Sequence, residues 1–157
     1  MNGAPIVVGV DGSPVSLAAL SWAVEEAAVS GREVRAVAAW TYTPALEPGG
    51  VVMPVDEMAA AHQRTLETLI GKVTGPDPGA VVRPDLVEGE PVDVLLEAAK
   101  GASMLVLGSH GHGRLMTVLL GSVSARCVRQ ADCPVVIIPA RTAGEGDAAQ
   151  VFGAPTR

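Results

Sequence analysis

Short runs of aliphatic residues alternate with longer segments of helical periodicity along this chain. The short runs cover residues 5–10, 33–40, 80–87, 104–107 and 134–139. Their length and aliphatic character are typical of strands that are buried on both faces. Pro84 cannot donate a hydrogen bond to a neighbouring strand, so the third run is predicted at an edge of its sheet. The alternation predicts an α/β fold, in which crossover helices cover both faces of a parallel sheet.

Helix start and stop signals separate the predicted strands. Ser13 is a favourable N-cap, Pro14 is favoured as a first helical residue, and Gly31 is typical of a helix end. Ser122 is predicted to cap the last helix. Helices are therefore expected over residues 14–30, 56–74, 91–100 and 122–131.

The chain has 157 residues, a length that fits one domain with a single core. We expect this domain to cover residues 1–140. The segment 141–157 holds Gly, Ala, Thr and acidic residues and is expected to be a flexible C-terminal tail.

Charge and composition argue against nucleic acid and membranes as partners. The net charge is −6, and the only lysines are Lys72 and Lys100. Two Trp, one Tyr and one Phe leave few rings for stacking on bases. No apolar run approaches the ~20 residues that span a bilayer, and no signal-peptide pattern opens the chain. Cys127 and Cys133 form no disulfide framework, so we expect free thiols and a cytoplasmic location.

A glycine-rich loop over residues 108–122 follows the fourth predicted strand. Gly108, Gly111 and Gly113 allow several main-chain amides to point at one anion. The helix start at Ser122 adds amides that have no acceptor within the helix. The loop has neither a P-loop string nor a dinucleotide-binding fingerprint. On the residues alone, a phosphate site and a purely structural turn both remain open.

Polar residues in two loops are candidates for a site at the carboxyl ends of the strands, where parallel sheets bind ligands. Asp11 directly follows the first strand and either contacts a ligand or only holds the turn over residues 11–14. His110 and His112 are two residues apart, without a carboxylate or a cysteine nearby, whereas a metal site needs three or four ligands. We therefore expect the histidines beside phosphate or in solvent, and no metal site in the protein itself.

Three motifs of the sequence occur in the same order as in a known protein family. The spacing Gly108-x2-Gly111-x9-Gly121-Ser122 resembles the signature of ATP-binding members of the universal stress protein family. Residues 6–13 resemble the first strand and loop of that family, and residues 133–139 resemble its closing strand. The resemblance covers about residues 4–140. It implies a Rossmann-like sheet of the adenine nucleotide alpha hydrolase type, with strand order 3-2-1-4-5.

The resemblance also implies which residues hold ATP. Asp11 and the main chain near Gly9 would contact the adenosine, and the main chain at Ala39 would lie against adenine. The residues expected around the ribose and phosphates are Gly108, Ser109, His110, Gly111, His112, Gly113, Arg114, Gly121, Ser122, Val123 and Ser124. Family members often carry more arginine in this loop, so a need for Mg²⁺ with the ATP stays open.

The expected function is that of an ATP-binding regulatory module of the stress response, with little or no catalysis. No nucleophile–base pair has a recognisable spacing, and no lysine is placed to stabilise a transferring phosphoryl group. The alternatives are a weak ATPase, an adenylate-forming enzyme of the ATP pyrophosphatase type, and a nucleotide-free dimeric module. A homodimer is expected because the last strand is apolar on both faces and lies at a sheet edge. The pairing residues would be Val135, Val136, Ile137 and Ile138.

Overall fold

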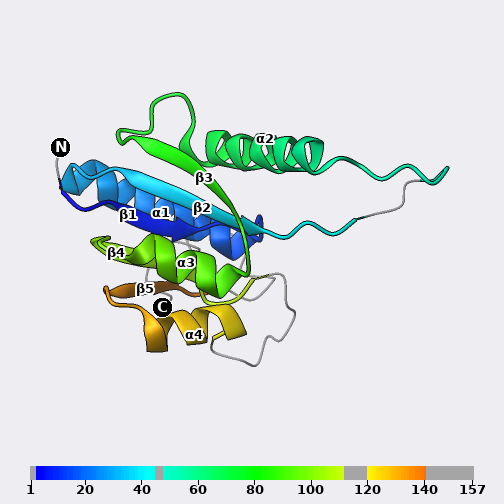
Figure 1. The fold of residues 1–157 in the computed structure, drawn as a ribbon. Helices are drawn as coiled ribbons and strands as arrows, with labels where there is room; N and C mark the ends of the chain where they lie inside the picture. Colours follow the sequence, from blue (N-terminus) through cyan, green and yellow to red (C-terminus); the bar gives the residue numbers. More distant parts are fainter. Residues whose placement is uncertain (1–2, 45–47, 112–119, 141–157) are drawn as a thin grey trace.

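The structure is a computed structural model that describes residues 3–44, 48–111 and 120–140 (Figure 1). The strands and helices alternate as the sequence predicts, and their ends agree within a residue or two. In chain order they are β1 (Ile6–Gly9), α1 (Pro14–Ser30), β2 (Val34–Trp40), α2 (Val55–Thr74), β3 (Val82–Glu88), α3 (Pro91–Ala99), β4 (Met104–Gly108), α4 (Ser122–Gln130) and β5 (Val135–Ile138).

The five strands form one sheet in the order β3-β2-β1-β4-β5, and all neighbours are parallel. This is the expected strand order. Pro84 lies in β3 at one edge of the sheet, as predicted, and β5 forms the other edge. β1 lies between β2 and β4. The chain therefore adds β2 and β3 on one side of β1, then crosses over and adds β4 and β5 on the other side. The carboxyl ends of β1 and β4 therefore mark the place where such sheets bind ligands.

Helices cover both faces of the sheet (Figure 1). The side chains of β1 alternate between the two faces, as the pleat of a strand requires. Ile6 and Val8 pack in a core with residues of α1 and α2, whereas Val7 packs in a second core with residues of α3 and α4. All three of these β1 side chains are fully buried. The aliphatic runs thus supply a sheet that is apolar on both faces.

The predicted caps of α1 are confirmed. Ser13 is the N-cap, and its side chain accepts a hydrogen bond from the amide of Ser16 at 3.3 Å. Gly31 ends the helix with φ 69°, a backbone conformation that favours glycine.

The cap predicted for α4 is wrong by one residue. Gly121 is the N-cap, and Ser122 is the first helical residue. The amide of Gly121 donates to the carbonyl of Ser109 at 2.6 Å, which fixes the chain before it enters the helix. The N-cap of α4 therefore supplies no side-chain hydrogen bond to the helix amides.

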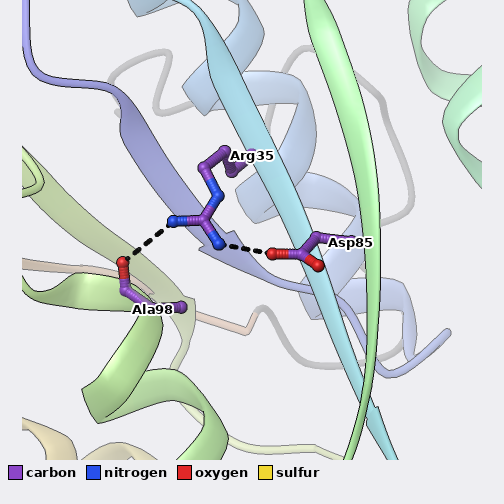
Figure 2. Close-up of polar contacts among 3 residues, drawn as sticks. All are labelled: Arg35, Asp85 and Ala98. Atoms are coloured by element: carbon purple, nitrogen blue, oxygen red, sulfur yellow. Dashed lines mark hydrogen bonds and ion pairs between the residues drawn. The ribbon is translucent and has the colours of Figure 1, made fainter.

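An ion pair between Arg35 and Asp85 joins β2 to β3 (Figure 2). The same guanidinium donates to the carbonyl of Ala98 at the end of α3, at 3.4 Å. About a third of each charged side chain is exposed. The pair therefore links three elements at a position that solvent still reaches.

Candidate functional site

A cavity of about 540 Å³ lies beyond the carboxyl ends of β1 and β4. Cavities of roughly 300–1,000 Å³ are typical of small-molecule sites. Aliphatic residues of β2, α3 and β4 line one part of the cavity: Val37, Ala39, Pro91, Leu95 and Leu107. The two predicted loops line another part, including Asp11, His110, Gly111, Gly121 and Ser122. The lining therefore combines aliphatic side chains with main-chain amides and polar side chains.

The fold brings together most of the residues that the sequence singled out. Those that line the cavity are Gly9, Asp11, Ala39, Gly108, His110, Gly111, Gly121, Ser122, Val123 and Ser124. Ser109 is buried behind the lining. His112, Gly113 and Arg114 lie outside the described residues.

The carboxylate of Asp11 stabilises its own loop and also faces the glycine loop. Its Oδ1 atom accepts hydrogen bonds from the amide of Ser13 at 2.9 Å and from the Ser13 hydroxyl at 2.5 Å. The Asp11 amide donates to Oγ of Ser16 at 3.3 Å. A Cβ atom at Gly111 would overlap Oδ2 of Asp11. The turn role considered for Asp11 is therefore present, together with a position at the cavity wall.

Close packing explains the glycines that end β1 and β4. A Cβ atom at Gly108 would lie 2.8 Å from Cγ1 of Val15 and 3.2 Å from its main-chain carbonyl carbon. At Gly9 it would lie 2.8 Å from Cδ2 of Leu107. The two distances of 2.8 Å are shorter than real contacts allow, so these glycines let α1 and neighbouring side chains approach the sheet.

The serine hydroxyls at the start of α4 differ in their surroundings. Ser124 is 5% exposed, and its hydroxyl donates to the carbonyl of Gly108 at 2.7 Å. That hydrogen bond ties α4 to the end of β4, so the Ser124 hydroxyl hydrogen is already used. Ser122 is exposed in the first turn of the helix, where main-chain amides lack helical acceptors.

Metal ligands are sparse in the described part of the chain. Within residues 3–44, 48–111 and 120–140, no group of three His, Cys, Asp or Glu side chains could hold a metal ion. Asp11 and His110 are the titratable residues among the described cavity lining. The described lining therefore offers a divalent cation the Asp11 carboxylate and the His110 imidazole as titratable ligands.

The sequence comparison decides the family. The universal stress protein family model matches residues 4–139. The chain belongs to that family. A universal stress protein of Mycobacterium tuberculosis is 35% identical over 137 residues, which cover 85% of this chain and 45% of the relative. A universal stress protein of Mycolicibacterium smegmatis is 33% identical over 87% of this chain and 46% of the relative. The chain thus spans less than half the length of these relatives.

Solved universal stress protein structures share the fold. One in complex with cAMP has a TM-score of 0.63 and 26% identity, and covers 89% of this chain and 100% of its own. One from Archaeoglobus fulgidus in complex with dAMP has a TM-score of 0.59 and 25% identity. The match covers 87% of this chain and 98% of that structure's chain. One from Burkholderia pseudomallei has a TM-score of 0.63 and 30% identity. That match covers 87% of this chain and 96% of the other chain. The Rossmann-like fold of the family is therefore this chain's fold.

Several lining residues of this universal stress protein were missed by the sequence reasoning. They are Val10, Ser16, Val37, Pro91, Leu95, Leu107 and Leu120. Val37 had a usable signal, because it lies two residues before Ala39 and so on the same face of β2. Pro91 and Leu95 are one helical turn apart in α3, but nothing in their sequence indicates that this turn borders a cavity.

Proposed function

We propose that the cavity binds an adenine nucleotide, with ATP as the first candidate. The chain would act as a nucleotide-dependent regulatory module of the stress response. The observation that carries this proposal is the meeting of an aliphatic wall with a glycine loop and a helix start around one cavity. Two solved relatives bind cAMP and dAMP, which supports the adenine nucleotide class.

The aliphatic part of the cavity suits the adenine and the ribose. Val37, Pro91 and Leu95 offer apolar surface to a flat base. The main chain at Ala39 and Gly9 lies at strand ends on the same cavity, where it can hydrogen-bond the polar edge of the base. Asp11 is a hydrogen-bond acceptor, and we assign it to the ribose hydroxyls.

The loop part of the cavity suits the phosphates. The first turn of α4 presents main-chain amides at Ser122 and Val123, and the positive end of the helix dipole favours an anion there. Gly111 and His110 lie on the same wall. We include Mg²⁺ as an ion that enters with the ATP, held mainly by phosphate oxygens and water.

Little or no catalysis is expected from this wall. The described lining holds no lysine or arginine, and Oδ1 of Asp11 already accepts two hydrogen bonds from Ser13. ATP consumption at about one turnover per second or faster would overturn the assignment to a regulatory module. Release of pyrophosphate with an acceptor substrate would favour the adenylate-forming alternative.

The edge strand β5 is the surface that we propose for a homodimer. Val135, Val136, Ile137 and Ile138 are each half-buried, and β5 has a strand neighbour on one side in the sheet. An apolar edge of this kind is protected by pairing with another strand. A monomeric mass at micromolar concentration would contradict the dimer, and a dimer without nucleotide binding would support the nucleotide-free alternative.

A cytoplasmic location is part of the proposal and rests on the two cysteines, both of which are free thiols. Among the helices that the structure describes, none has the length and apolar character needed to cross a bilayer.

Retained nucleotide tests the proposed function. The protein is purified rapidly, denatured, and the released small molecules are identified by mass spectrometry. The proposal expects an adenine nucleotide in wild type and far less in a Gly111→Ala variant prepared in parallel. A guanine or pyrimidine nucleotide would contradict the assignment of the base.

A further inference from the structure

Ser109 directly follows β4 and is 6% exposed. Its amide donates to the carbonyl of Ile138 at 2.8 Å, and its carbonyl accepts from the amide of Gly121 at 2.6 Å. Its hydroxyl oxygen accepts from the amide of Ala140 at 3.1 Å and lies 3.3 Å from Nδ1 of His110. One buried residue therefore ties the cavity loop to the end of β5 and to the start of α4.

The hydroxyl of Ser109 lies within hydrogen-bonding distance of the ring of His110. The amide of Ala140 brings its own hydrogen, so the Ser109 hydroxyl hydrogen needs a different acceptor. A buried O–H group without an acceptor is unfavourable, and Nδ1 of His110 lies within reach. If Nδ1 accepts this hydrogen, a neutral imidazole carries its own hydrogen on Nε2.

We propose that Ser109 is a positioning residue that holds His110 in the Nε2–H tautomer. His110 then offers a neutral N–H donor to the anionic part of the ligand. His110 lines the cavity, and a Cβ atom at Gly121 would lie 3.1 Å from its Cα atom, so the residue is adjacent to the start of α4. The role toward a nucleotide rests on the proposed function, whereas the tautomer is a property of the protein alone.

Nitrogen NMR of the nucleotide-free protein tests the tautomer. Ring nitrogens are observed in ¹⁵N-labelled protein at about pH 8.5, where an ordinary histidine with a pKa of ~6.5 is neutral. A His110→Gln variant identifies the His110 signals. We expect Nδ1 to be unprotonated and Nε2 to be fully protonated in wild type. In Ser109→Ala we expect the exchanging mixture of a solvated imidazole.

Ser103→Ala is the matched control for this experiment. Ser103 lies just before β4, as Ser109 lies just after it, and its hydroxyl donates to the carbonyl of Pro5 at 3.0 Å. This control should leave the His110 signals unchanged. An Nδ1–H tautomer in wild type, or the same tautomer mixture in wild type and Ser109→Ala, would overturn the proposal.

ATP titrations test the consequence for binding. Loss of one hydrogen-bonded contact should weaken ATP binding by about 3- to 10-fold in Ser109→Ala. Ser103→Ala should bind as wild type does. In a His110→Gln background, Ser109→Ala should cause little further loss, because both changes act on one contact. Equal losses of ATP affinity in Ser109→Ala and Ser103→Ala would overturn the proposal. So would a loss of about 3- to 10-fold when Ser109→Ala is added to His110→Gln. If wild type binds no nucleotide, the proposed function fails while the nitrogen spectra still decide the tautomer.

Discussion

A methyl group at Gly111 would overlap the carboxylate oxygen Oδ2 of Asp11. Gly111 belongs to the loop after β4, and Asp11 belongs to the loop after β1. These two loops meet because β1 and β4 are parallel neighbours in the sheet. The wall of the cavity thus depends on a glycine at this one place, where a side chain would push against the acidic group.

Gly111→Ala should therefore impair nucleotide binding and leave the fold intact. The new methyl group would push on Oδ2 of Asp11, an exposed residue, while the other oxygen, Oδ1, can keep its hydrogen bonds to Ser13. We expect at least about a tenfold loss of ATP affinity, equivalent to ~1.4 kcal/mol, with a melting temperature close to that of wild type. Calorimetric titration and thermal melting check the two parts separately.

Gly71→Ala is the matched control for that substitution. Gly71 lies within α2, is exposed, and a Cβ atom there would meet no atom within 4 Å. Alanine in a helix is favoured over glycine by about 0.5–1 kcal/mol, so the melting temperature should rise. ATP affinity should not change. A loss of ATP affinity in Gly71→Ala would show that glycine substitutions act through a general change of the fold.

Gly108→Ala should destabilise the fold. The added methyl group would meet side-chain and main-chain atoms of Val15, and the main chain cannot move aside cheaply. Overpacking of this kind costs about 1–3 kcal/mol. Urea unfolding followed by circular dichroism measures the loss, and wild-type stability in this variant would contradict the packing role of Gly108.

Arg35→Ala should destabilise the fold moderately and in a salt-dependent manner. The pair with Asp85 is partly exposed, so we expect a loss of about 1 kcal/mol or less. High salt should reduce the difference from wild type, because it screens the ion pair. Urea unfolding at low salt and at about 1 M NaCl measures both effects.

Arg83→Ala is the comparison variant for Arg35→Ala, because Arg83 forms a more exposed ion pair. Arg83 contacts Glu33 at 3.0 Å, but its side chain is 64% exposed, against 34% for Arg35. Its loss should have the smaller effect on stability. Equal losses for the two arginines would contradict the importance of the contacts that Arg35 makes with both Asp85 and Ala98.

Cys127 should make the fold less stable at alkaline pH. The thiol is fully buried in α4, and this burial raises its pKa above the ordinary value of 9.0. Above pH 9.0 the unfolded chain releases the thiol proton while the folded chain retains it. The free energy of unfolding therefore falls as the pH rises through this range.

Unfolding measurements from about pH 8 to about pH 10 test this dependence. Cys127→Ala is expected to cost stability near pH 8 through lost packing. Its disadvantage relative to wild type should shrink as the pH rises. A disadvantage that stays constant with pH would contradict the assignment to Cys127.

The fold could be predicted well from the sequence because its signals are local. Each aliphatic run has a glycine or a proline within two residues of at least one of its ends. Pro84 alone assigns β3 to an edge. The cap of α4 could not be predicted correctly, because the bond between Gly121 and Ser109 joins residues on either side of a loop. Contacts of that kind leave no pattern in neighbouring residues.

The site could be predicted only in part. The glycine spacing indicates the loop wall, yet it does not reveal that Gly108 is needed for packing against Val15. The Ser124 hydroxyl was expected to face phosphate, but it bonds the carbonyl of Gly108 because α4 packs against the end of β4. The aliphatic wall at Leu95 depends on how α3 docks on the sheet, which tertiary packing decides.

Titration of nucleotide-free protein with ATP tests the central claim most directly. Heat of binding is measured for wild type and for Gly111→Ala under identical conditions. We predict one saturable site per chain in wild type and at least about tenfold weaker binding in the variant. No heat and no rise in melting temperature at millimolar ATP, or equal affinities in the two proteins, would contradict the account.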